Sequence, residues 1–301
     1  MIGRIFRSLQ FRARYRFREH LRTKYELLVA KMPAIPMAEK ADAGIVLLQF
    51  AGRRQLPMMC ECVRSIGLTW STLPDVHIVT DGSIDPREAV QALAWWPKRV
   101  TSEEWSFSAK RGMDRGIPEL VRLADGHVLG KKFAAIIDLA LARPMLFCDS
   151  DILWFKGPPP LPQSSPPVLK LTSDITCSYD LPLVQAITPD LLQSPTWLNS
   201  GVIFAHGDLI SAANLKPALQ FAADHPAYFS EQSLLAIAAS RLGTAPWTID
   251  QIMLKIDDAV RRPTPSFTNQ PWFARHYVGD VRHWFWYDSM KLREGHARET
   301  V

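Results

Sequence analysis

Short apolar runs that alternate with helical stretches constrain the fold of this chain more than any other feature. The first run covers residues 45–50, and the second covers residues 76–80 and ends at an Asp-Gly-Ser turn. Continuous apolar runs of this length are typical of strands buried on both faces of a parallel sheet. Further elements are predicted as helices at 56–68, 87–96 and 130–143 and as strands at 99–101 and 144–155. The alternation predicts an α/β domain with a mostly parallel central sheet and flanking helices.

The pattern changes after residue 156. A proline-rich loop at 157–167 precedes two strand-like segments at 168–171 and 201–205, and a helix is predicted at 231–241. The tail is aromatic, and for most of its tryptophans packing is favoured over a binding role. We expect one continuous domain over residues 41–301, made of two halves at about 41–156 and about 157–301.

Basic residues are concentrated at the start of the chain. Residues 1–40 hold ten of the 35 Lys and Arg residues and three of the 30 Asp and Glu residues, so their net charge is +7 and that of residues 41–301 is −2. The nearly neutral body argues against nucleic acid as a partner. Residues 1–40 are therefore predicted to be a basic helical arm and a linker. Spacings of three and four predict one apolar helical face, formed by Ile2, Ile5, Phe6, Leu9, Phe17, Leu21, Tyr25 and Leu28.

Two roles of the arm stay open. In the first, which we favour, the arm packs on its own domain or on a neighbouring subunit. In the second, residues 1–32 contact an anionic membrane surface. The sequence has no apolar run of about 18 residues and no secretory signal pattern. Its four cysteines form no zinc or redox motif, and Cys148 and Cys177 are expected to be buried. We therefore expect a cytoplasmic protein, peripheral at the inner membrane face if the arm binds lipid.

Asp149 and Asp151 are the most informative residues. They directly follow an apolar segment, 144–147, which itself follows the predicted helix at 130–143. Residues two apart in a strand point to the same side, about 7 Å apart along the chain, so both carboxylates are expected at the end of one buried strand. Ligands bind at the carboxyl ends of parallel strands in open α/β sheets. A divalent cation would offset the charge repulsion there, and oxygen ligands suit Mg²⁺ or Mn²⁺ bridged to a diphosphate.

The motif and its surroundings resemble glycosyltransferases of the GT-A fold, in particular family 8 and its bacterial relatives. The order and spacing of the motifs agree over roughly residues 44–285. The resemblance implies a Rossmann-like GT-A fold and transfer of a sugar from a nucleotide-diphosphate sugar. It also implies that residues 41–156 are the nucleotide-binding half and residues 157–301 the acceptor-side half, and that an acceptor sugar could stack on a tryptophan of the tail. A UDP-sugar is the favoured donor, and a saccharide, a lipid-linked molecule or a protein is the acceptor. The matching motifs are Asp149-x-Asp151, Asn199-x-Gly201, Glu231-Gln232 and His276 followed by Gly279.

The resemblance also implies a role for each candidate residue. Asp149, Asp151 and His276 would hold the divalent metal, Mn²⁺ or Mg²⁺. The metal would stabilise the departing nucleoside diphosphate as charge develops on it. The catalytic candidates are Glu231 and Gln232. The candidates for donor binding are Asp81, Lys131, Lys132, Asp149, Asn199 and Gly201.

Other interpretations stay open. His206 and His283 compete with His276 as metal ligands. Lys131 and Lys132 equally suit a solvated first helical turn, Asp81 an Asp-Gly turn, and Glu231 a favourable charge at a helix N-terminus. Two other functions are considered for the whole chain. One is a GT-A-like binding or scaffolding module without activity, and the other is a haloacid-dehalogenase-like phosphatase with the first aspartate as nucleophile.

Overall fold

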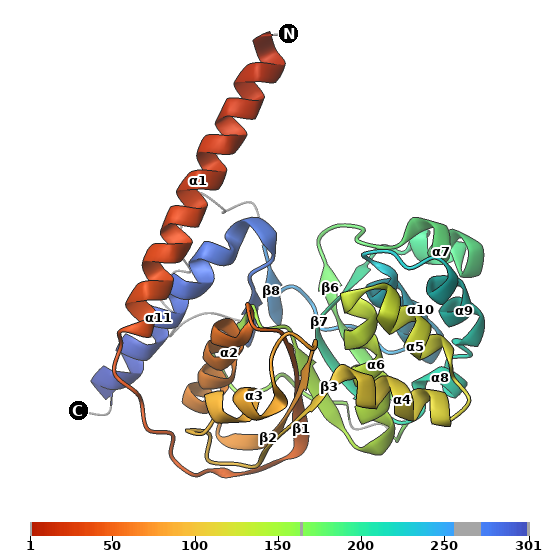
Figure 1. The fold of residues 1–301 in the computed structure, drawn as a ribbon, viewed down its shortest axis with the longest axis horizontal. Coiled ribbons are helices and arrows are strands. Elements are labelled where there is room, and N and C mark those ends of the chain that lie inside the picture. Colours follow the sequence, from red (N-terminus) through yellow and green to blue (C-terminus); the bar gives the residue numbers. More distant parts are fainter. Residues whose placement is uncertain (1, 163–164, 256–271, 300–301) are drawn as a thin grey trace.

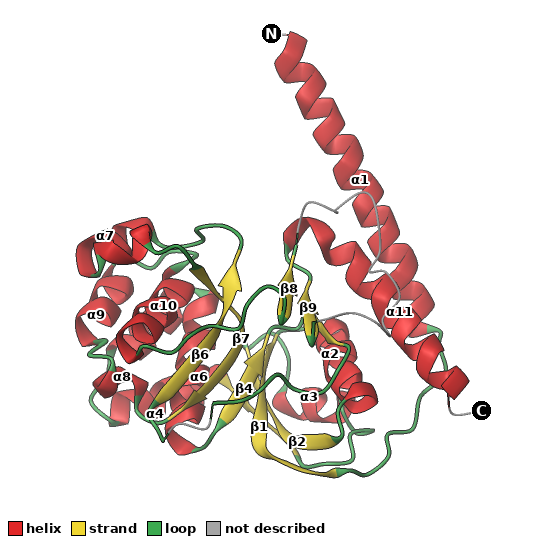
Figure 2. Ribbon diagram, turned by 180° about the vertical axis from the view of Figure 1, so that it is seen from behind, coloured by secondary structure: helices red, strands yellow, loops and turns green. Residues whose placement is uncertain are grey.

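The apolar runs form a central sheet of six strands. The computed structural model describes residues 2–162, 165–255 and 272–299. The protein has a mixed α/β fold (Figure 1, Figure 2). The strand order is β3-β2-β1-β4-β7-β6. These strands are β1 (Ala41–Ala51), β2 (Thr72–Thr80), β3 (Val100–Glu104), β4 (Met145–Cys148), β6 (Val168–Asp174) and β7 (Trp197–His206).

The sheet is mostly parallel, as the sequence predicts. The β1–β2, β2–β3 and β1–β4 pairs are parallel, whereas β7 runs antiparallel to both β4 and β6. The carboxyl ends of β1 to β4 and of β6 therefore meet the amino end of β7 at one edge of the sheet. This edge collects the polar residues described below.

A second, small sheet is formed by β5 (Ile152–Trp154), β8 (Ile252–Leu254) and β9 (Ala274–His276), in the order β5-β9-β8. The prediction of one strand over 144–155 is therefore wrong. The backbone N–H of Asp149 bonds to the Gly201 carbonyl at 2.8 Å, and the N–H of Ile152 bonds back to the Asp149 carbonyl at 3.2 Å. The second bond closes a turn, so the chain leaves the central sheet between the two aspartates.

Helices cover both faces of the central sheet. The helices predicted at 56–68 and 130–143 are confirmed, the second ending at Ala142, while the helix expected at 87–96 ends earlier, at Ala92. The helices are α2 (Leu56–Thr69), α3 (Pro86–Ala92), α4 (Trp105–Asp114), α5 (Glu119–Gly126), α6 (Val128–Ala142), α7 (Leu181–Ile187), α8 (Leu209–Ala212), α9 (Lys216–Asp224), α10 (Ser230–Leu242) and α11 (Arg282–Glu299), with short 3₁₀ turns at Pro189–Gln193 and Gly279–Val281.

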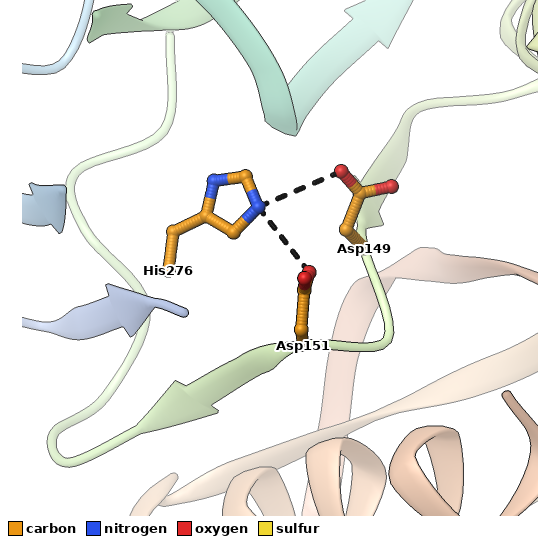
Figure 3. A group of neighbouring side chains, drawn as sticks. All are labelled: Asp149, Asp151 and His276. Carbon is orange, nitrogen blue, oxygen red and sulfur yellow. Dashed lines mark ion pairs between the residues drawn. The ribbon is translucent and has the colours of Figure 1, made fainter. Parts of the chain in front are cut away.

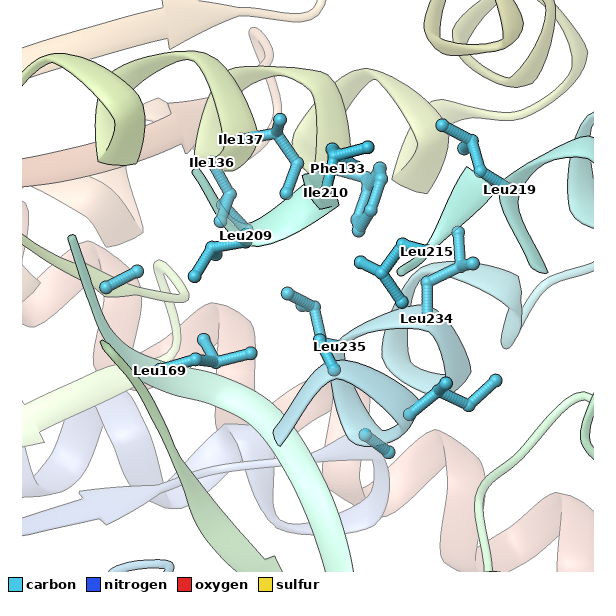
Figure 4. Packing of buried hydrophobic residues seen from close by; sticks show 14 of the residues in the cluster. Phe133, Ile136, Ile137, Leu169, Leu209, Ile210, Leu215, Leu219, Leu234 and Leu235 are labelled. Carbon is cyan, nitrogen blue, oxygen red and sulfur yellow. The ribbon is translucent and has the colours of Figure 1, made fainter. Parts of the chain in front are cut away.

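The core alternates across β4. Met145 and Phe147 pack into the cluster on the side of α6 and α10, and Leu146 and Cys148 pack into the cluster on the side of α2 and β5. This is the period of two expected for a strand buried on both faces. Figure 4 shows the first cluster, in which Phe133 and Ile136 of α6 approach Leu235 of α10. Each such side chain contributes roughly 1.5–3 kcal/mol on burial.

The basic arm is a helix, α1 (Ile2–Ala30), as predicted. Its C-terminal part lies along α11, whereas its N-terminal part extends away from the other described elements (Figure 1, Figure 2). Val29 is buried against α11, and the Tyr25 ring meets that of Tyr287 at 5.0 Å between centroids. Packing on its own domain is thus found for one end of the arm. No helix in the described ranges is long and apolar enough to cross a membrane. Cys148 is buried, but Cys177 is exposed, contrary to the prediction.

Candidate metal centre and donor site

The two aspartates lie in the turn that connects the central sheet to the small sheet. Asp149 follows β4 and its side chain is 32% exposed, so one carboxylate faces the open edge of the sheet. The side chain of Asp151 is only 4% exposed and lies directly before β5. The turn, rather than the strand geometry expected from the sequence, brings the two carboxylates to the same place.

His276 reaches these carboxylates because β9 pairs with β5. The register places His276 opposite Ile152, and the Tyr277 N–H bonds to the Asp151 carbonyl at 2.9 Å. The His276 Nε2 atom lies 3.2 Å from Asp151 Oδ1 and 3.8 Å from Asp149 Oδ2 (Figure 3). One ligand atom from each residue lies within 4.8 Å of the other two.

Gly201 makes room for the His276 ring. Gly201 belongs to β7, and a Cβ atom built at this position would overlap the ring and approach Asn199 Oδ1 to 2.9 Å. Real Cβ atoms essentially never approach other atoms that closely, so only glycine fits without a shift. The close approach of strand and histidine thus requires the glycine of the Asn-x-Gly motif.

Arg282 and His276 both contact the carboxylate of Asp151. The Arg282 Nε donates to Asp151 Oδ2 at 2.8 Å, and His276 faces the other oxygen. Burial alone would raise the pKa of Asp151, but His276 and Arg282 outweigh it and lower the pKa to about 2. The carboxylate is therefore ionised at neutral pH, as a metal ligand must be.

Lys132 lies beneath the site rather than on its surface. Its Nζ is 3.0 Å from Asp149 Oδ1 and 3.3 Å from Glu231 Oε1, and it donates to the Ser200 carbonyl at 3.1 Å. Burial would lower the pKa of Lys132, but the carboxylates of Asp149 and Glu231 outweigh it and raise the pKa. A buried ammonium thus joins the exposed aspartate to the carboxylate of α10.

Glu231 is 2% exposed and receives a hydrogen bond of 3.0 Å from Ser200 Oγ. Burial raises its pKa, and the Lys132 ammonium opposes that shift. The sequence suggested a helix-terminal carboxylate or a group beside the acceptor hydroxyl. Glu231 is the second residue of α10, so the helix-terminal position is confirmed, and its buried carboxylate lies under the site, where it contacts Lys132.

Lys131 and Asp81 meet at the end of β2. Lys131 Nζ donates to the Asp81 carbonyl at 2.9 Å and lies 4.5 Å from the centroid of the Trp105 ring. The Asp81 carboxylate accepts from the N–H and the hydroxyl of Ser83 at 2.8 and 2.6 Å, so it forms the turn considered above. Lys131 and Lys132 diverge because successive helical residues point about 100° apart.

Asn199 and Gln232 converge on Asp174, which the sequence analysis did not single out. Asn199 Nδ2 and Gln232 Nε2 donate to Asp174 Oδ2 at 3.0 and 3.3 Å, and Gln232 also donates to the Ser178 carbonyl at 2.9 Å. Asn199 Oδ1 accepts from the Gly201 N–H at 2.8 Å. Asp174 ends β6 at the same edge of the sheet, but no motif surrounds it in the sequence.

The competing histidines lie elsewhere. His206 is at the opposite end of β7 from Asn199, about 23 Å along the strand. His283 is buried in α11, where its ring lies against that of Trp284 at 4.6 Å between centroids. Of His206, His276 and His283, only His276 belongs to the group that could hold a metal among the described residues.

No family model matches this chain, and no curated protein matches its sequence. Solved structures do share its fold. The chain is similar to the galactosyltransferase LgtC, solved with donor and acceptor sugar analogues, at 14% identity and a TM-score of 0.52 over 83% of this chain and 96% of LgtC. It is also similar to the bifunctional glycosyltransferase WbbM in its apo form, at 12% identity and a TM-score of 0.52 over 87% of this chain and about half (52%) of WbbM. The chain therefore has the GT-A fold of these glycosyltransferases.

Proposed function

We propose that this protein is a metal-dependent glycosyltransferase that moves a sugar from a nucleotide-diphosphate sugar, with a UDP-sugar as the favoured donor. The observation that carries the proposal is the meeting of Asp149, Asp151 and His276 at the carboxyl edge of the central sheet. This edge is where ligands bind in open α/β sheets. The acceptor is a saccharide, a lipid-linked molecule or a protein. The GT-A fold leaves the phosphatase alternative without support.

The three residues suit a hard divalent cation. They supply two carboxylates and one imidazole, a set that Mn²⁺ and Mg²⁺ accept, and their ligand atoms lie close enough to share one ion. Asp151 and His276 are buried and fixed by backbone pairing, whereas Asp149 borders open space. Asp151 and His276 thus form a fixed, buried part of the site, and the space beside Asp149 stays accessible to a substrate that would also contact the ion. When bound, the ion would neutralise charge on the leaving diphosphate.

The remaining groups would orient the donor. The Arg282 side chain is 54% exposed, and its guanidinium pairs with the Asp151 carboxylate. Once a metal ion binds Asp151, the guanidinium would be free to bind a donor phosphate instead. Lys131 and Asp81 lie where β2 ends, the position expected for the nucleoside. Asn199, Gln232 and Asp174 form a polar group at the end of β6 that suits sugar hydroxyls.

Glu231 fits a positioning role better than that of a base. Its 2% exposure leaves almost no surface for an acceptor hydroxyl, while its contact with Lys132 fixes the ammonium that holds Asp149. Replacing Glu231 by Gln separates the roles. A positioning residue would change metal affinity and leave the shape of the pH–rate profile intact. A base would lose about 10²-fold or more in transfer together with one limb of the profile.

Donor binding in the presence and absence of Mn²⁺ tests the proposal. A panel of nucleotide-sugars is scanned by thermal unfolding, because a ligand of the native state stabilises by about 2.7 kcal/mol at a hundredfold excess over its Kd. We expect stabilisation by a UDP-sugar only with metal, and hydrolysis of that donor to the nucleoside diphosphate. Metal-dependent binding without hydrolysis or transfer would support the scaffold alternative. If no nucleotide-sugar binds and simple phosphate esters are hydrolysed, the proposal is wrong.

A further inference from the structure

α1 carries exposed apolar side chains both in its N-terminal part and in the part that lies along α11. Arg18 and Val29 are buried toward the body, but Phe17, Leu27 and Leu28 are 50%, 55% and 41% exposed. Spacings of seven and four place Phe17, Lys24 and Leu28 on one face, which is turned by about 100° from that of the buried Arg18 and Val29. Figure 1 and Figure 2 both show that the N-terminal part of the helix stands clear of the other described elements.

The N-terminal part of α1 is strongly basic. Residues 2–18 contain six arginines and no acidic residue, and the first carboxylate of the chain is Glu19. Arg14 and Arg16 are exposed beside Tyr15, which is 54% exposed. Like charges at this density repel one another, so two arms pairing side by side would be unfavourable. A partner of the arm must instead be anionic and must also accept apolar side chains.

We propose that α1 docks along the surface of a bilayer rich in anionic phospholipid. The exposed Arg14 and Arg16 face the lipid phosphates, and Phe17 and Leu28 enter the boundary between headgroups and acyl chains. A helix with basic and apolar exposed residues binds such an interface by both attractions together. The 29 residues of α1 span about 44 Å, enough to lie along the surface while α11 holds its C-terminal end.

This docking is independent of the proposed chemistry, because it uses no residue of the metal centre. It differs from binding to a nucleic acid, which offers phosphates but no apolar layer for Phe17 or Leu28. The contribution of the apolar side chains therefore distinguishes the two partners. Charge alone would serve for either.

Vesicle co-sedimentation of the full chain tests the proposal. The vesicles contain phosphatidylcholine alone or with about one third phosphatidylglycerol. We expect binding to the anionic vesicles only, and its loss at about 1 M salt, where the Debye length falls to about 3 Å. Each basic residue near the surface strengthens binding roughly fivefold, so Arg14→Glu with Arg16→Glu should weaken it more than about 25-fold. Phe17→Ser should weaken it further at constant charge.

A matched control reverses two exposed lysines of the body, Lys110→Glu and Lys216→Glu, which changes the net charge by the same amount. This control should bind vesicles within about threefold of the unchanged protein. All variants should keep the same melting temperature and the same hydrolysis of a soluble donor. Equal weakening by the arm and body reversals would overturn the proposal, as would unchanged vesicle binding by Phe17→Ser. Tighter binding to a duplex oligonucleotide than to the anionic vesicles would also overturn it.

Discussion

Replacing Lys132 by Met tests whether the buried ammonium keeps Glu231 charged beneath the site. The change preserves most of the side-chain volume. It removes the Lys132 ammonium, which lies 3.3 Å from Glu231 Oε1 and is the only cation paired with this carboxylate among the described residues. Breaking a buried ion pair in this way destabilises by about 3–5 kcal/mol, because the remaining charge has no partner. The variant can avoid this only by protonating Glu231.

The size of the effect follows from that protonation. Adding a proton to a glutamate with an unfolded pKa of about 4.3 costs about 3.7 kcal/mol at about pH 7 and about 1 kcal/mol at about pH 5. In the variant the folded pKa of Glu231 lies above the unfolded one. Its stability is therefore highest below about pH 4.3 and falls by about 1.4 kcal/mol per pH unit above it. We expect a loss of about 4 kcal/mol at neutral pH that shrinks to about 1 kcal/mol at about pH 5.

Urea unfolding at several pH values measures this loss. Adding Glu231→Gln to Lys132→Met should restore about 3 kcal/mol at neutral pH and remove the slope, since an amide needs no proton. Lys110→Met, at an exposed position of α4, is the control and should stay within about 0.5 kcal/mol of the unchanged protein. A loss for Lys132→Met that is the same at both pH values would refute the reasoning, because Glu231 would then be neutral already.

Three other substitutions address the metal centre. Asp151→Asn should lower transfer by at least ~10²-fold and abolish Mn²⁺-dependent donor stabilisation, since a catalytic metal supplies several kcal/mol. The pKa of Asp151 is lowered to about 2, so its ion pairs stabilise the fold above about pH 4, and this stabilisation is lost as the pH falls toward 2. The difference in free energy of unfolding between Asp151→Asn and the parent should therefore be smallest at the lowest pH. Gly201→Ala should weaken Mn²⁺ binding by displacing His276, whereas Gly157→Ala, with no atom within 4 Å, should not. Arg282→Gln should raise the KM for the donor more than about tenfold and leave Mn²⁺ affinity equal or higher, and equal KM values would remove Arg282 from the donor site.

The sequence predicted those parts of the fold that long apolar signals encode. The runs at 45–50 and 76–80 became β1 and β2, and the segment at 130–143 became α6. Helices α4, α5, α7, α8 and α9 were not predicted, because each has at most ten residues and shows too few turns for a clear period. The aromatic tail became α11, whose apolar residues pack against α1 and β5.

The site shows the same limit at the level of single residues. The Asp-x-Asp motif was found because its two members are neighbours in the sequence. Arg282 lies 131 residues from its partner Asp151, and Asp174 lies 58 residues from Gln232, so no local pattern reports either contact. The burial of Glu231 was missed for a related reason. Its position depends on Ser200 and Lys132, which come from two other elements.

The candidate metal centre lies across the junction of the central sheet and the small sheet. Asp149 is fixed to the central sheet by its N–H bond to Gly201, whereas Asp151 and His276 are fixed to each other by the β5–β9 pairing of the small sheet. The turn at 149–151 is the covalent link between these two groups. A bound ion would add a second link, so it would resist any movement of the small sheet relative to β4. We therefore expect metal binding to raise protein stability through this junction, and a substitution that shifts either sheet to change the affinity for the ion even where it contacts none of Asp149, Asp151 and His276.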